Sequence, residues 1–148
     1  MAFSKRIGPL VALVIVCAVA ATYAVTSPMQ DAEQPLPASI ADLATVSQVE
    51  VRDGSAVVLS GQFGAEVEDG DDIKRVAPLT AATGAAKGEA EVEFDADNRA
   101  NQELEVSVEG ATARATLEVF IDGQLAGSFQ TNARGKGDIE LTRGTDVQ

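Results

Sequence analysis

Carboxylates are the side chains of this sequence with the widest chemical capacity. The densest run surrounds Gly70 and consists of Glu66, Glu68, Asp69, Asp71 and Asp72. Oxygen ligands clustered in a loop are what Ca²⁺ requires, so this run is a candidate calcium site. It lacks the alternating ligand spacing and the terminal glutamate of the helix–loop–helix calcium motif. A solvated acidic turn is therefore the competing interpretation.

A second candidate metal segment alternates oxygen-bearing side chains at Asp95, Asp97 and Asn98. Arg99 follows at the next ligand position, where its positive charge would repel a cation. Neither segment is assigned as a metal site. Calcium-dependent binding through these acidic loops is retained as an alternative hypothesis for the function.

Paired carboxylates can also perform acid–base catalysis without histidine, as in glycoside hydrolysis. Such a site needs one carboxyl in an apolar setting, which raises its pKa, and aromatic faces for the sugar. Beyond the amino-terminal segment the aromatic side chains are Phe63, Phe94, Phe120 and Phe129, which are better explained as core anchors. A carboxylate hydrolase therefore ranks behind the binding hypotheses.

Histidine and tryptophan are absent from the 148 residues, and Cys17 is the single cysteine. Triads that use histidine are therefore excluded, and no ligand set has the spacing of a zinc or iron site. Gly135-Lys136-Gly137 lacks the glycine loop of a nucleotide site and is interpreted as a turn. The net charge of -12 repels phosphates, so nucleic acid is not an expected partner. The sequence predicts no catalytic residue, no cofactor and no metal.

Residues 1–25 predict export of the chain. Lys5 and Arg6 precede an uncharged, mostly apolar stretch over 7–25, and acids follow only after it. This charge order predicts an amino end in the cytoplasm and a remainder that crosses the membrane. Ala18 and Ala20 suit a cleaved signal peptide, while the length of the stretch equally suits a single-pass signal anchor. We expect an apolar leader helix, membrane contact through this segment alone, and a domain in the cell envelope or outside the cell.

Residues 26–44 contain Pro28, Pro35 and Pro37 among small and polar side chains. This composition is typical of a semi-rigid spacer, so we expect the domain to cover residues 45–148. The domain has no cysteine, and packing alone must stabilise it.

Beyond Ala44, apolar and polar side chains alternate with a period of two, which predicts strands rather than helices. The clearest alternations lie at 89–94, 103–109 and 117–121. We predict an all-β domain, a single antiparallel β-sandwich of immunoglobulin-like size with about seven strands. A small β-barrel is the second choice. In the sandwich each sheet hides one face against the other and the glutamates line the outer faces, where solvation accounts for most of the acidic excess.

The sequence also predicts the surroundings of two further segments, 56–59 and 76–79. The run from Ala56 to Leu59 is apolar throughout, which predicts a strand covered on both faces. Pro78 cannot donate to a ladder, which restricts 76–79 to an edge strand or a loop.

Asp53-Gly54 and Asp122-Gly123 are the strongest hairpin signals, because Asp-Gly favours two-residue turns. At the second, a two-residue loop sets Phe120 opposite Leu125 and leaves both faces of the hairpin partly apolar. A three-residue loop including Gln124 would instead expose Phe120 and gather the other apolar side chains on one side, namely Leu117, Val119, Ile121, Leu125 and Phe129. We favour the two-residue loop, in a hairpin central enough to be covered on both sides.

The segment from Leu117 to Thr131, followed by Gly135 to Leu141, reads as a strand, an Asp-Gly hairpin, a second strand, a glycine turn and a third strand. This order resembles the carboxyl-terminal part of small exported bacterial β-sandwich proteins of unknown function. The resemblance implies a β-sandwich and assigns a role to no residue.

The leader, the strands and the missing catalytic residues together predict an exported, non-catalytic β-sandwich module for envelope or surface interaction. Its expected partner is a protein or a surface component of the envelope, whose identity the sequence does not give.

Overall fold

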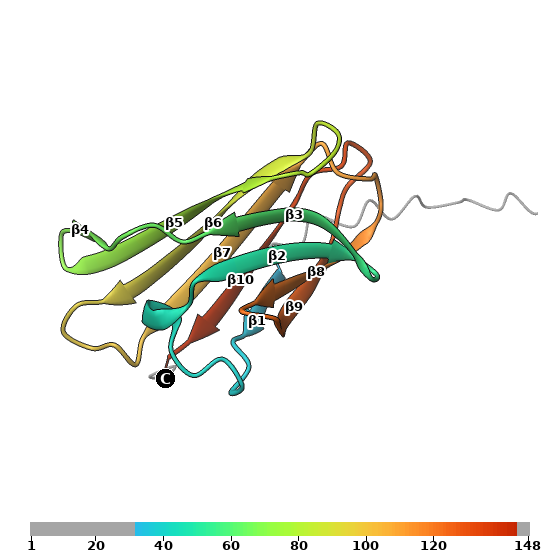
Figure 1. The fold of residues 1–148 in the computed structure, drawn as a ribbon. Coiled ribbons are helices and arrows are strands. Elements are labelled where there is room, and N and C mark those ends of the chain that lie inside the picture. Colours follow the sequence, from blue (N-terminus) through green and yellow to red (C-terminus); the bar gives the residue numbers. More distant parts are fainter. Residues whose placement is uncertain (1–31, 145–148) are drawn as a thin grey trace, which may run out of the picture.

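A computed structural model describes residues 32–144, which form an all-β domain as predicted (Figure 1). Its strands are β1 (Ala32–Pro35), β2 (Gln48–Asp53), β3 (Ala56–Gln62), β4 (Val67–Asp69), β5 (Asp72–Thr80), β6 (Lys87–Asp95), β7 (Gln102–Glu109), β8 (Thr116–Ile121), β9 (Gln124–Gln130) and β10 (Gly137–Arg143). One 3-10 turn, η1 (Leu43–Thr45), precedes β2. The predicted leader helix, with the rest of 1–31, lies outside the described residues. No helix within 32–144 is long and apolar enough to cross a membrane.

The strands form one sheet in the order β1-β10-β7-β6-β5-β3-β2-β8-β9, with β4 beside β5. Every pairing is antiparallel except that of β1 with β10. The sheet curves into a nearly closed barrel (Figure 1). β3 and β5 are joined through a single residue pair, Ser60 with Thr80. This short pairing separates the sheet into two halves. The two edge strands of the sheet, β1 and β9, are bridged by a hydrogen bond of 2.8 Å from Gln34 Nε2 to the Ser128 carbonyl oxygen. The arrangement is thus closer to the barrel than to two separate sheets.

The barrel interior holds the core, because side chains alternate between the two sides of each strand. Val92, Leu104, Val106, Ile139 and Leu141 on β6, β7 and β10 are completely buried. The positions between them carry acids and face outward. Burial of each such aliphatic side chain contributes about 1.5–3 kcal/mol, so this alternation is sufficient to fix which face is inside.

The Asp122-Gly123 hairpin has the predicted register, with Phe120 paired to Leu125. Both turn residues have positive φ, 47° at Asp122 and 82° at Gly123, as a two-residue hairpin turn of this kind requires. The expectation of cover on both sides is wrong, because β9 ends the sheet and Leu125 is 48% exposed. A bulge in β9, opposite Val119 and Phe120 of β8, shifts the phase of this strand. The shift brings Phe129 onto the interior face, so the structure combines the Phe120–Leu125 pair of the two-residue loop with the interior Phe129 expected of the three-residue loop.

The apolar run from Ala56 to Leu59 forms part of β3, but it is not covered on both faces. Leu59 is buried, whereas Val57 is 46% exposed on the outer side. The 76–79 segment belongs to β5, in which Pro78 pairs with Glu89 of β6. β3 approaches this proline closely, since a Cβ on Gly61 would lie 2.4 Å from the Pro78 carbonyl oxygen. Only glycine permits that contact.

The predicted spacer is part of the domain from residue 32 onward, so the domain does not begin at 45. β1 pairs with β10, and the chain then turns under one end of the barrel. Leu36, Ile40 and Leu43 are buried there. Proline and small residues did indicate an extended chain, but composition carries no information about the strand with which that chain pairs.

Candidate functional site

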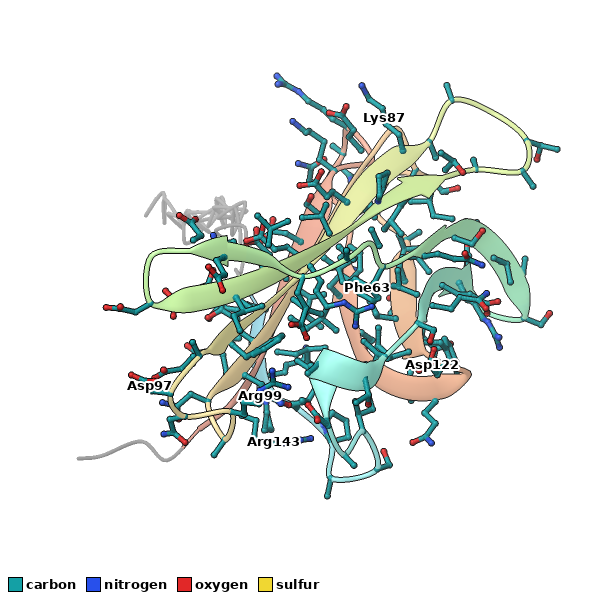
Figure 2. The ribbon with its side chains drawn as sticks, turned by 60° about the vertical axis from the view of Figure 1, so that its left-hand side comes forward. Phe63, Lys87, Asp97, Arg99, Asp122 and Arg143 are labelled. Atoms are coloured by element: carbon teal, nitrogen blue, oxygen red, sulfur yellow. The ribbon has the colours of Figure 1, made fainter. Side chains whose placement is uncertain are left out.

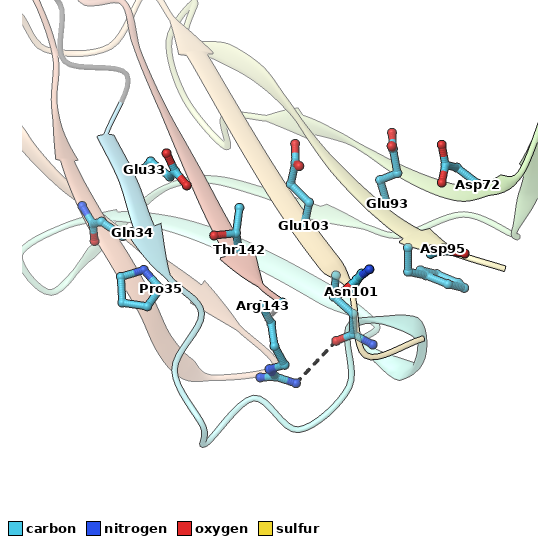
Figure 3. Close-up of a pocket in the computed structure, with 13 residues that line it drawn as sticks. Glu33, Gln34, Pro35, Asp72, Glu93, Asp95, Asn101, Glu103, Thr142 and Arg143 are labelled. Atoms are coloured by element: carbon cyan, nitrogen blue, oxygen red, sulfur yellow. Dashed lines mark hydrogen bonds between the residues drawn. The ribbon is translucent and has the colours of Figure 1, made fainter. Parts of the chain in front are cut away.

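The most distinctive surface is the outer face of β6, β7 and β10, which we call the acidic face. It consists of Glu89, Glu91, Glu93, Glu103, Glu105, Asp138 and Glu140. These residues alternate with the buried side chains of the same three strands, so the packing of the core forces them outward. In Figure 3, Glu93 and Glu103 project from adjacent strands toward the same side of the sheet.

The register sets like charges directly against one another. Glu91 pairs with Glu105, and Glu93 pairs with Glu103. Glu105 also pairs with Glu140 on its other side. Directly opposed like charges destabilise a sheet, whereas opposite charges stabilise it. The acidic face is therefore assembled against the usual preference for cross-strand pairs.

The opposed carboxylates alter the proton affinity of the central strand. Partial burial, and then the charges of Glu140 and Glu93, raise the pKa of Glu103. Partial burial, and then the charges of Glu91 and Asp138, raise the pKa of Glu105. Both effects disfavour the ionised form, because low-dielectric surroundings and neighbouring negative charges each penalise a carboxylate.

Lys74 of β5 provides a counter-charge at one border of the acidic face. Its Nζ lies 2.9 Å from Glu93 and 3.3 Å from Glu91. It also lies 3.6 Å from Asp69, on the neighbouring strand β4. Hydrogen bonds to Glu93 and Glu91 raise the pKa of this lysine, which keeps it charged. Seven carboxylates greatly outnumber this one ammonium group.

The acidic face is hollowed along its length. A depression of about 560 Å³ lies at one end, where Glu33, Glu93, Glu103 and Arg143 are among the lining residues (Figure 3). A smaller hollow of about 70 Å³ lies between the central strands and is lined by Glu89, Glu91, Glu105 and Ser107. A third, of about 370 Å³, lies at the opposite end beside Lys87 and Lys136. Figure 2 shows Lys87 and Arg143 at opposite ends of the barrel.

Gln102 lines the large depression. It is 5% exposed, and its Oε1 accepts from the backbone N–H of Leu43 at 3.0 Å. Its Nε2 donates to Asp42 Oδ1 at 2.7 Å. Arg143 reaches the same amide oxygen at 3.4 Å (dashed line in Figure 3) and also donates to the Pro37 carbonyl at 3.1 Å. These bonds attach the segment before β2 to the start of β7 and to the end of β10.

The two candidate calcium segments are neighbours in the structure. Asp69 pairs with Asp72 across the Gly70 turn, and Asp72 pairs with Asp95. Asp95 Oδ1 accepts from the backbone N–H groups of Asp97 and Asn98, at 3.1 and 3.2 Å. Within residues 32–144, no three His, Cys, Asp or Glu residues are grouped to hold a metal ion.

The other residues singled out in the sequence lie in a turn, in the core and on the outer face of the barrel. Lys136 follows Gly135 in a turn, as interpreted, and its Nζ lies 3.7 Å from Glu109. Phe63, Phe94 and Phe129 are buried anchors. Phe120 is the exception, because it lies on the outer face with the Arg52 guanidinium 4.1 Å above its ring.

A hydrolase would need a carboxyl held in an apolar interior. The buried polar side chains among residues 32–144 are Gln102 and Thr131, neither of which is an acid. The described carboxylates lie instead on open faces and in turns, as solvated side chains do.

Sequence reasoning identified the glutamates as outward-facing but did not assemble them into one surface. The alternation over 89–94 and 103–109 was the available signal, since it assigns each residue to a face. The positions of β10 beside β7 and of Lys74 at the border depend on strand order, which alternation does not contain. Comparison of the chain with protein-family models, with curated proteins and with solved structures gave no match.

Proposed function

We propose that this chain is an exported, non-catalytic interaction module of the cell envelope, and that its acidic face binds a positively charged partner. The single observation that carries the proposal is the register of β6, β7 and β10. It holds Glu91, Glu105 and Glu140 in one row across three strands. A cationic partner would relieve the repulsion within this row, which gives binding a favourable electrostatic contribution.

The shape of the face supports the same proposal. The hollows along β6 and β7 are shallow and open, and acids from adjacent strands line them. Such a surface fits an extended basic segment of a protein better than a small molecule, which binds in a concave and mostly apolar pocket. Export supplies the location, since the charge order of residues 1–25 directs the domain out of the cytoplasm.

Site-directed photocrosslinking in the cells that produce the protein tests the proposal. The photoreactive residue replaces Ser107, which is exposed between Glu89 and Asp138 in the sheet register. The matched control replaces Ser128, an exposed serine on the outer face of β9. We expect a crosslinked partner with a basic surface from position 107 alone.

Charge removal provides the second arm of the experiment. The triple substitution Glu91→Gln, Glu105→Gln, Glu140→Gln should abolish the crosslink from position 107, because it removes the opposed row while preserving side-chain size. Equal crosslinking from both serines, or an adduct that persists in the triple variant, would refute binding through the acidic face.

A further inference from the structure

Glu105 lies on the central strand of the acidic face, between acids on both neighbouring strands. Glu91 lies opposite it on β6, and Glu140 lies opposite it on β10. Glu89 and Asp138 add further negative charge to its surroundings. On the same strand, Glu103 faces Glu93 in the register and is influenced by Glu91 and Glu140 as well.

The neighbouring cation compensates the border of the face rather than its centre. Lys74 projects from β5 and pairs with Glu91 and Glu93, both on β6. Thr142, which is neutral, lies opposite Glu103 on β10. In the register, Glu105 is therefore opposed by negative charge on both neighbouring strands, and Glu103 by negative charge on β6.

We infer that the acidic face makes this domain sensitive to pH. Protonation of Glu103 and Glu105 stabilises the folded sheet and weakens the attraction of the face for a cation. The first consequence concerns stability and holds with or without a partner. The second consequence rests on the proposed function.

The sign of the stability effect follows from the direction of the pKa shifts. The pKa values of Glu103 and Glu105 are raised by partial burial and by the surrounding carboxylates. A carboxyl with a higher pKa in the folded state destabilises that state when it is ionised. The penalty is fully present above the folded-state pKa. It disappears as the pH falls through that pKa toward the unfolded value of about 4.3.

Other groups titrate in the opposite sense, so the comparison must be made between variants. Lys87 lowers the pKa of Glu109 at the far end of β7, and this favourable pairing is lost as Glu109 becomes protonated. Subtracting the wild-type value from that of a variant at each pH removes the contribution of Glu109, because both proteins contain it.

Urea unfolding of the full chain, measured from pH 7.5 to pH 4.5, tests the stability consequence. The variants are Glu103→Gln and Glu105→Gln, with Glu66→Gln as the control, since Glu66 is exposed in a loop outside the face. We expect both face variants to unfold at higher urea than wild type at pH 7.5. This advantage should be constant above the folded-state pKa values of the two carboxyls and should shrink as the pH falls through them, while the control stays close to wild type at every pH.

Two results would overturn the inference. One is a face variant that unfolds at lower urea than wild type at pH 7.5, and the other is an advantage that does not change with pH. Because the measurement contains no partner, its outcome is independent of the crosslinking result. A deca-lysine peptide then tests binding: its affinity for the wild-type chain should fall between pH 7.5 and pH 5, and the drop should be smaller for Glu105→Gln. An equal drop in both proteins would refute control through this residue.

Discussion

Replacing Gln102 by methionine tests whether residues 36–46 are an integral part of the domain. The substitution preserves the length of the side chain and removes both of its polar atoms. In the folded protein the Leu43 N–H then loses its acceptor at 3.0 Å, in a buried position. The Asp42 carboxylate loses the donor at 2.7 Å but keeps the Ala44 N–H at 2.9 Å.

The expected loss of stability is dominated by the Leu43 N–H. An unsatisfied buried donor costs about 1–3 kcal/mol. Asp42 is partly exposed and can exchange the lost bond for water, so its contribution is smaller. We expect a total of about 2 kcal/mol, against a global stability of about 5–15 kcal/mol for domains in general. With a urea dependence of about 1–3 kcal/mol per molar, the unfolding midpoint should fall by about 1 M.

Urea unfolding and limited proteolysis measure this prediction. Gln62→Met is the matched control, since Gln62 is exposed on β3 and its replacement should change stability by less than about 0.5 kcal/mol. We expect Gln102→Met to unfold earlier and to be cleaved faster within 36–46. If it unfolds with the control and resists the protease equally, the segment before β2 is not held by Gln102 and the reasoning fails.

Two further substitutions test the packing and the charge of the sheet. Gly61→Ala should be clearly destabilising in thermal unfolding, because the new methyl would lie 2.4 Å from the Pro78 backbone oxygen; an unchanged melting temperature would contradict this close approach. Lys74→Met should lower the melting temperature at low salt and recover in 0.5 M NaCl, since it removes the cation bound to Glu91 and Glu93. A loss that salt does not reduce would indicate lost packing rather than lost charge.

Local sequence patterns predicted the parts of the fold that local physics decides. Alternation placed Leu104 and Val106 inside and Glu103 and Glu105 outside, because a strand has a period of two. The turn at Asp122-Gly123 was predictable as well, because both residue types tolerate the positive φ that a two-residue hairpin turn requires.

The features that depend on distant partners were not predictable in the same way. The parallel pairing of β1 with β10 joins residues about one hundred positions apart, and no periodicity within β1 specifies it. The bulge in β9 likewise depends on the interior that Phe129 enters. The acidic face belongs to this class, since its opposed pairs exist only once β6, β7 and β10 are neighbours.

The other half of the barrel shows that solvation alone does not require opposed acids. On the outer face of β2 and β8, Arg52 forms an ion pair with Glu50 and lies opposite Glu118 in the register. The other outward positions of this half include Gln48, Gln62, Thr116 and Gln130, all uncharged and exposed. This sheet face is solvated by neutral polar groups and by opposite charges that attract each other, as cross-strand preferences favour.

The same chain therefore builds one outer face according to the usual pairing rule and one against it. If the glutamates served only to keep the protein in solution, mixed charges on β6, β7 and β10 would achieve the same without the repulsion of Glu105 by Glu91 and Glu140. Local rules are broken in natural proteins chiefly where a site needs the arrangement. That contrast between the two faces is the physical reason to look for a cationic partner on this side of the barrel.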